Sequence, residues 1–201
     1  RRGYVVAAPC MVPFGRRVDR TAYGGQDPCA VTFVRMQLLG KILMAENLRD
    51  CLWAYELLKQ QRLVIPERIG CVGLSYGGRM TMLTAALAPS IRCAVVSGAL
   101  NVMQERIRHR YSCGGQVIPG LLRYGDIPEI GSLIAPRSCI WETGSQDGLI
   151  VQPWADDAMS RMRQFYERLR AAEHLQRDQF QGGHRWNGEL ALPMLKQVLT
   201  A

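Results

Sequence analysis

A serine placed between glycines is the strongest chemical signal in this sequence. Ser75 lies within Gly73-Leu74-Ser75-Tyr76-Gly77, which fits the pattern G-x-S-x-G. A serine hydroxyl is a weak nucleophile unless the backbone lifts it clear of its neighbours, leaves room for a base and aims amide N–H groups at the developing oxyanion. Gly73 and Gly77 lack the Cβ atoms that would collide in a sharp strand-to-helix turn, and Gly78 lets the helix pack close to the strand. The same pattern also fits a glycine-rich turn that merely joins a strand to a helix.

Two other residues have the chemistry to work with such a serine. His184 follows Gly182 and Gly183, and an imidazole is suited to take the serine proton and return it to a leaving alcohol. Asp147 lies in a Gly-Ser-Gln-Asp-Gly turn and would accept the other ring N–H, which fixes the tautomer. Taken singly, each also fits a role without catalytic chemistry, as a surface histidine or a turn-forming aspartate.

The predicted elements place these three side chains together. Ser75, Asp147 and His184 each follow the end of a predicted strand, in that order along the chain. In an open α/β sheet, sites form beyond the C-terminal ends of the strands. We therefore expect the three residues to form a catalytic triad at one edge.

Other titratable residues are weaker candidates. Asp156 and Asp157 fall inside the next predicted helix, and His109 and His174 are interpreted as bystanders. None of the seven cysteines is in a C-x-x-C pair and the three histidines are isolated, so we predict no metal site and no cofactor. The cysteines fall mostly in apolar segments, where free thiols act as small core residues. This favours a reducing compartment, and we expect a cytoplasmic protein.

Apolar patterning predicts strands that alternate with helices. Strands are expected at residues 3–9, 68–74, 91–98, 138–143 and 175–180. Helices are expected at residues 30–39, 44–60, 101–110 and 154–172, directly behind Ser75 and at the C-terminus. Such alternation predicts an α/β fold with a doubly wound, mainly parallel sheet. Residues 11–28 are expected to form a long loop.

The length and composition favour one domain. With 201 residues, 48% of them hydrophobic, residues 1–201 can bury a single sizeable core. Residues 111–136 are irregular and rich in Gly and Pro, so residues 101–136 are predicted to be an insertion that caps the site. The sequence has no apolar run long enough for a membrane span and no signal-peptide pattern, and it begins with Arg1 rather than Met.

The net charge of +8 comes mainly from arginine. The arginines are scattered and lack the interleaved aromatic residues of a nucleic-acid platform, so we expect no nucleic-acid or membrane partner. The densest cluster, at residues 106–110, is interpreted as a solvated helix face, with an anion-facing or nucleic-acid-binding patch as the alternative.

Beyond these residues, wider stretches resemble the α/β-hydrolase superfamily, and in particular its dienelactone-hydrolase and acetyl-xylan-esterase-like branch. The stretches are GYVVAAP at residues 3–9, RIGCVGLSYGG at 68–78, GSQD at 144–147 and GGHRW at 182–186. The resemblance implies that Ser75 is the nucleophile, His184 the base, Asp147 the orienting acid and the Tyr76 N–H an oxyanion donor. It also implies a serine esterase without a cofactor, a carboxylesterase or acetyl esterase acting on small acyl or carbohydrate esters. Tyr76, the insertion and Trp186 would then bind the ester substrate, although Trp186 also fits a packing role.

The sequence departs from that family at its beginning. In the family, a strand and an H-G-x-x type loop come before the position of residue 1, and the loop supplies the second oxyanion N–H. Nothing in this sequence matches that loop. We therefore expect an N-terminally truncated sheet. Three arrangements would complete it: a further N-terminal segment, direct pairing of the remaining strands, or a partner chain such as a second copy. Loss of one oxyanion donor costs roughly a hundredfold to a thousandfold in rate.

Two other functions remain open. Ser75-Tyr76-Gly77-Gly78 also resembles prolyl-oligopeptidase-like serine peptidases, although this sequence has no propeller domain. The other alternative is a catalytically weak, hydrolase-like scaffold that binds a partner through its unpaired region or its basic surface. Peptide substrates would distinguish the first alternative from an esterase, and a serine-reactive probe would distinguish the second.

Overall fold

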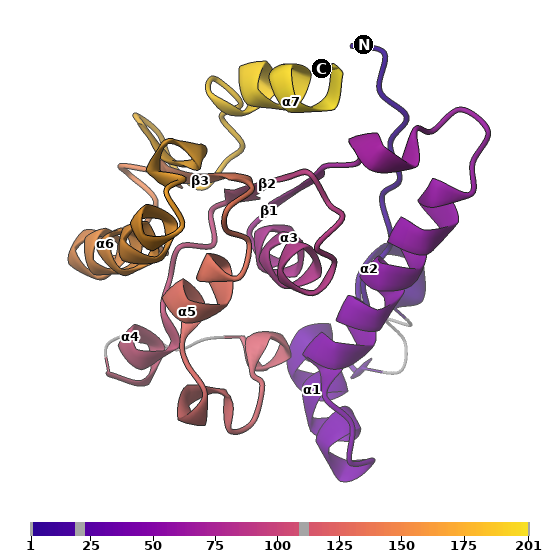
Figure 1. Ribbon diagram of the computed structural model, residues 1–201. Helices are drawn as coiled ribbons and strands as arrows, with labels where there is room; N and C mark the ends of the chain where they lie inside the picture. The colour runs from indigo at the N-terminus through magenta and orange to yellow at the C-terminus, as the bar shows by residue number, and fades with distance from the viewer. Residues whose placement is uncertain (1, 19–22, 109–112, 201) are drawn as a thin grey trace. The chain divides into compact units, whose positions relative to one another are not determined.

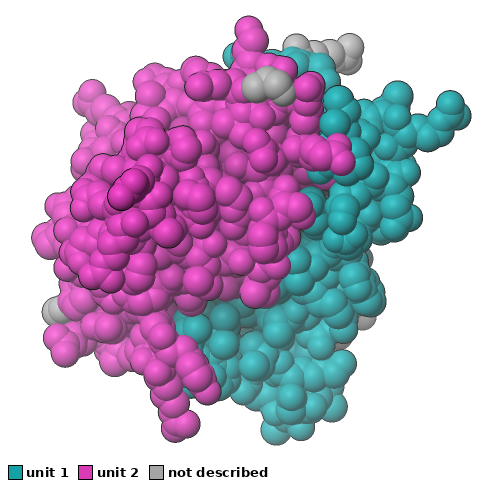
Figure 2. Space-filling model, in the orientation of Figure 1, with its two compact units in different colours: residues 1–66, 111–121 teal, residues 67–110, 122–201 magenta. Residues whose placement is uncertain are grey.

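The computed structural model describes residues 2–18, 23–108 and 113–200, and the chain divides into two compact units. Unit 1 comprises Arg1–Pro66 and Tyr111–Leu121, and unit 2 comprises Glu67–Arg110 and Leu122–Ala201. Figure 2 colours unit 1 teal and unit 2 magenta. Residues 101–136, predicted to form one insertion, are thus divided between the units. A single domain with a cap stays a prediction.

Unit 2 is built on a parallel sheet of four strands. They are β1 (Cys71–Leu74), β2 (Cys93–Ser97), β3 (Ser138–Gly144) and β4 (Leu175–Phe180), in the order β1-β2-β3-β4. Every residue of β2 is buried, in keeping with its continuous apolar run. The predicted parallel sheet of an α/β fold is confirmed.

Helices cover both faces of this sheet. On one face lie α3 (Tyr76–Leu87), α5 (Ile127–Ser132) and α6 (Gln152–Arg168), and on the other lies α7 (Ala191–Thr200) (Figure 1). The α7 side packs Ala191, Met194 and Leu195 against residues of β2 and β3. The short helix α4 (Met103–Arg108) follows β2. Short 3-10 helices lie at Pro66–Arg68, Leu121–Arg123 and Ala172–His174.

Unit 1 contains two longer helices, α1 (Pro28–Leu38) and α2 (Leu43–Lys59), close to their predicted positions. Asp27 caps α1 by accepting the backbone N–H groups of Cys29 and Ala30. Short 3-10 helices lie at Gly15–Arg17 and Gly114–Gln116. Among the described helices, none has by itself the length and apolar character of a membrane span; α1 and α2 meet that criterion only as a pair bent by 98°.

Residues 3–9 do not form the predicted buried strand. They have no regular secondary structure, and Val5 and Val6 are 47% and 80% exposed (Figure 1). The apolar run satisfies the sequence pattern of a strand, but a buried strand also needs neighbours to hydrogen-bond with. Within the described part of the chain, the sheet contains only β1 to β4, so no strand pairs with residues 3–9.

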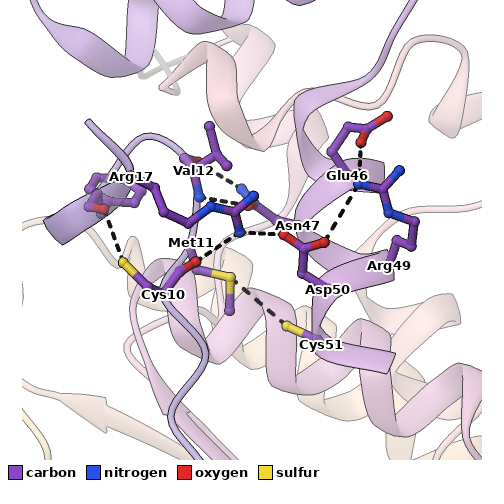
Figure 3. A network of polar contacts seen from close by, with 10 residues as sticks. Cys10, Met11, Val12, Arg17, Glu46, Asn47, Arg49, Asp50 and Cys51 are labelled. Atoms are coloured by element: carbon purple, nitrogen blue, oxygen red, sulfur yellow. Dashed lines mark hydrogen bonds and ion pairs between the residues drawn. The ribbon is translucent and has the colours of Figure 1, made fainter. Parts of the chain in front are cut away.

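The chain after residues 3–9 is instead attached to α2. The Asn47 side chain accepts the Val12 N–H and donates to the Val12 carbonyl, both at 2.8 Å (Figure 3). Arg17 donates to the Cys10 carbonyl at 3.0 Å and forms an ion pair with Asp50. The Asn47 side chain of α2 thus satisfies both backbone groups of Val12, which lies in the predicted loop after residues 3–9.

Candidate active site

Ser75 lies at the sharp turn between β1 and α3. Its φ of 59° and ψ of −119° place it in a region that residues other than glycine rarely adopt. The Ser75 N–H donates to the Ser97 carbonyl at 2.8 Å, which ties the turn to the end of β2. The strand, strained turn and helix match the geometry that presents a nucleophilic serine at the end of a sheet.

The glycines around Ser75 have different roles. A Cβ at Gly73 would lie 2.3 Å from the Gly77 carbonyl oxygen, and a Cβ at Gly78 would lie 2.5 Å from the Ser97 carbonyl oxygen. A Cβ at Gly77 would meet no atom within 4 Å. The expectation that both flanking glycines avoid a collision is therefore right for Gly73 and wrong for Gly77, because it is the Gly77 backbone that occupies the space beside Gly73.

His184 and Asp147 are in direct contact. The His184 Nδ1 lies 2.7 Å from the Asp147 Oδ2, and the Asp147 side chain is 1% exposed. The other carboxylate oxygen, Oδ1, accepts the Leu149 N–H at 2.9 Å, so the carboxylate is oriented by its own turn. When Nδ1 donates to the carboxylate, Nε2 is the basic nitrogen of the neutral ring.

The histidine ring reaches the end of the sheet where Ser75 lies. A Cβ at Gly98, which follows β2, would be 2.8 Å from the His184 Cε1 and 3.1 Å from the Leu74 Cδ1. The ring and the residue before Ser75 therefore pack against the same glycine, which has a φ of +59°. The Asp147–His184 pair is formed, and a hydrogen bond from Ser75 to His184 stays a prediction.

Tyr76 and Trp186 lie in different surroundings. Tyr76 is the first residue of α3, so its N–H is at the helix N-terminus directly after Ser75. Trp186 is partly buried and packs against the core cluster formed by β2, β3 and α7. Packing accounts for Trp186, and a contact with substrate stays a prediction for both residues.

The weaker candidates are engaged elsewhere. Asp156 pairs with Arg177, Asp157 pairs with Arg161, and the His174 Nδ1 contacts the Pro136 carbonyl at 2.7 Å. His109 lies outside the described residues. Among the residues that the structure describes, no group of three or more His, Cys, Asp and Glu side chains could hold a metal ion.

Glu142 is a residue of the site that the sequence reasoning missed. It lies on β3 with its side chain fully buried, and its Oε1 accepts the Gly188 N–H at 2.7 Å. Its Oε2 accepts the Asn187 N–H at 3.3 Å. The Asn187 side chain also donates to Asp178 of β4 at 2.9 Å. Buried carboxylates thus anchor the loop that carries His184, and the available signal was a charged residue within an apolar strand.

Two arginines lie near the end of β2, and the sequence reasoning missed the first of them, Arg79. Arg79 of α3 is buried, and it donates to the Asn101 carbonyl at 2.9 Å and to the Asn101 side chain. Burial lowers the pKa of Arg79 to about 10, so it remains charged at neutral pH. Arg106 was expected on a solvated face, but its side chain is 7% exposed, lies 3.8 Å from Glu105 and donates to the Leu149 carbonyl. The solvated-face interpretation is therefore wrong for Arg106, and residues 109 and 110 of that cluster lie outside the described residues.

Solved structures with the same fold place this arrangement in a known class of fold. The chain has the fold of the α/β hydrolases. A solved structure from Bacteroides fragilis NCTC 9343, named as an acetyl xylan esterase, aligns with a TM-score of 0.76 at 18% identity, over 93% of this chain and 57% of that one. A CE15 glucuronoyl esterase from Caldicellulosiruptor kristjansonii aligns with a TM-score of 0.59 at 15% identity, over 74% of this chain and 48% of that one.

Sequence comparison gives two further likenesses. Residues 41–105, which include Ser75, match the Prolyl oligopeptidase family. YtaP of Bacillus subtilis (strain 168), described as a hydrolase, is 30% identical over 147 residues, which are 70% of this chain and 48% of YtaP. The chain therefore spans about half the length of the curated relative that it matches.

Proposed function

We propose that this chain carries the active site of a serine hydrolase that cleaves carboxylic esters. The hydrogen bond between His184 and the buried carboxylate of Asp147 is the observation that carries the proposal. A histidine held in this way can act as a base toward a serine, and Ser75 stands on a strained turn at the same end of the sheet.

The reaction would proceed in two stages. Ser75 Oγ attacks the ester carbonyl while His184 takes its proton, and the Tyr76 N–H donates to the oxyanion that forms. His184 then gives the proton to the leaving alcohol, and an acyl-enzyme remains. Water, activated by His184, attacks the acyl-enzyme and releases the acid. Asp147 stabilises the imidazolium at each stage.

The proposed substrates are small acyl esters, including acyl groups carried on carbohydrates. The names of the two structural neighbours, an acetyl xylan esterase and a glucuronoyl esterase, support this substrate class. Both neighbours are less than one fifth identical to this chain, so the choice of ester is part of the proposal rather than of the fold.

Hydrolysis of a chromogenic acetate ester tests the proposal. Wild-type protein should turn over the ester, and Ser75→Ala should abolish turnover while the exposed helix serine variant Ser160→Ala retains it. Turnover that persists in Ser75→Ala would refute the assignment. A fluorophosphonate probe should label Ser75, and absence of labelling in folded protein would favour a binding scaffold over an enzyme.

A serine peptidase is the second candidate. The match of residues 41–105 to the Prolyl oligopeptidase family favours it, because the matched segment includes the Ser75 turn. An ester and an amide with the same acyl group distinguish the two functions. Cleavage of the ester without cleavage of the amide supports the esterase. Cleavage of the peptide amide at a rate comparable to that of the ester supports the peptidase.

A further inference from the structure

Two thiols that are far apart in the sequence meet in unit 1. The sulfur atoms of Cys29 and Cys113 lie 2.6 Å apart, although the residues are separated by 84 positions. Both are free thiols; Cys29 is 6% exposed and Cys113 is partly buried. Other cysteines have different neighbours, since Cys51 contacts the Met11 sulfur and Cys71 contacts the Thr81 hydroxyl.

Two glycines bring the Cys113 segment onto α1. A Cβ at Gly114 would lie 2.7 Å from the Phe33 ring, and a Cβ at Gly115 would lie 2.6 Å from the Cys29 sulfur. Cys29 and Phe33 are four residues apart on α1, so they lie on the same face of the helix. Because both glycines are in such close contact, the backbone lies flat on this face and the two sulfur atoms can meet.

The surroundings of the pair favour one ionised sulfur. A hydrogen bond from Cys29, together with one from the Gly115 backbone, lowers the pKa of the Cys113 thiol against the opposing effect of burial. The same interaction and burial raise the pKa of Cys29, which keeps its proton. Cys29 is also the second residue of α1, where the positive end of the helix dipole favours negative charge nearby.

The pair is accessible to a small reagent. Cys113 is only partly buried. A cavity of about 190 Å³ also lies beside Cys29; it is lined by Pro13, Phe14, Gly15, Val18, Asp27, Pro28 and Cys29. A peroxide molecule is little larger than a water molecule, and a cavity of this volume has room for several waters.

From this geometry we infer that Cys29 and Cys113 form a dithiol site that hydrogen peroxide oxidises to a disulfide. The Cys113 thiolate attacks one peroxide oxygen, the O–O bond breaks, and hydroxide leaves to become water, so that Cys113 becomes a sulfenic acid. The Cys29 sulfur then attacks the Cys113 sulfur, the S–S bond forms, the S–O bond breaks, and a second water leaves with the Cys29 proton. Two thiols lose two electrons and two protons, and peroxide is reduced to two waters.

The disulfide would join α1 to the segment at residues 113–121. It would close a loop of more than eighty residues, which restricts the unfolded chain strongly. We expect the oxidised protein to melt about 5–15 °C above the reduced protein. The inference does not depend on esterase activity, so it can be tested in the Ser75→Ala protein as well as in wild type.

Peptide mapping of the full chain tests this inference. The protein is treated with hydrogen peroxide, the remaining thiols are alkylated, and a non-reducing digest is analysed by mass spectrometry. We expect a cross-linked peptide pair that contains Cys29 and Cys113, an intact mass lower by two hydrogens, and reversal by dithiothreitol. Cys29→Ser and Cys113→Ser should each lose the cross-link and the rise in melting temperature, whereas the control Cys71→Ser should keep both.

The wild-type digest decides the question even if a serine variant does not fold. Cross-links between other cysteines or between chains would overturn the inference. So would oxidation of Cys113 to a sulfinic or sulfonic acid while Cys29 remains a free thiol, because a neighbouring thiol in the proposed geometry would react with the sulfenic acid first.

Discussion

The two glycines that flank Ser75 should respond to alanine in opposite directions. In Gly73→Ala, the new methyl group would lie 2.3 Å from the Gly77 carbonyl oxygen and 2.4 Å from its carbonyl carbon. Both are backbone atoms of α3, so the clash can be relieved only by moving the helix or the strand. In Gly77→Ala, the methyl group would meet no atom within 4 Å. The residue is in the first turn of α3, and its φ is not in the positive region.

The expected magnitudes follow from these contacts. Overpacking by one methyl group costs about 1–3 kcal/mol of unfolding free energy, and a backbone contact this short is at the upper end of that range. Alanine is better than glycine inside a helix by up to about 1 kcal/mol, and by less in the first turn. One kcal/mol changes the melting temperature of a chain of this size by about 2–4 °C. We therefore expect Gly73→Ala to melt about 6–12 °C lower than wild type and Gly77→Ala to melt up to about 4 °C higher.

Thermal unfolding followed by circular dichroism measures both variants against wild type. The change in chemistry is identical at the two positions, so each variant is the control for the other. If Gly77→Ala were destabilised as much as Gly73→Ala, the close approach of the β1 and α3 backbones would lie elsewhere and the reasoning would fail. Ester hydrolysis gives a second measure, because a displaced α3 also displaces Ser75 and should lower kcat in Gly73→Ala.

Two further substitutions test how the histidine is held. Glu142→Gln replaces a buried acceptor of the Gly188 N–H, so it should lower the unfolding free energy by about 1–3 kcal/mol. It should also lower kcat with little change in KM. An unchanged melting temperature and an unchanged kcat would contradict the anchoring role. Asp147→Asn should retain the Leu149 N–H bond and the fold but place an amide N–H against the ring, which lowers kcat on the order of 10⁴-fold if the triad operates. Steady-state kinetics and melting curves check both, and near-normal turnover in Asp147→Asn would remove Asp147 from the mechanism.

The sequence predicted the elements of unit 2 because their signals are local. β2 is a short apolar run and α6 an amphipathic helix, and each can be recognised from its own residues. The positions of Asp147 and His184 followed from a general rule about the ends of parallel strands. That rule needs only the order of strands and loops, which the sequence contains, and the two side chains are in contact in the structure.

The features that the sequence did not predict depend on partners that are distant along the chain. Residues 3–9 have the composition of a buried strand, but burial also requires neighbouring strands, and composition does not show whether these exist. The pairing of Cys29 with Cys113 joins positions 84 residues apart and depends on two glycines that looked like ordinary loop residues. Glu142 was predicted only as part of a strand. Its role could not be predicted, because that role depends on the backbone of a later loop.

One run of hydrogen bonds explains how the site is held together. The Ser75 N–H donates to the Ser97 carbonyl at the end of β2, and the Gly98 N–H donates to the Glu142 carbonyl of β3. The Glu142 side chain then accepts the Gly188 N–H from the loop after His184. The serine turn, the glycine under the histidine ring and the histidine loop are thus linked through β2 and β3, and the Asn187 side chain adds a bond from the loop to Asp178 of β4. The outer edge of β1 takes no part in these links, so changes at that edge should leave the Asp147–His184 pair intact.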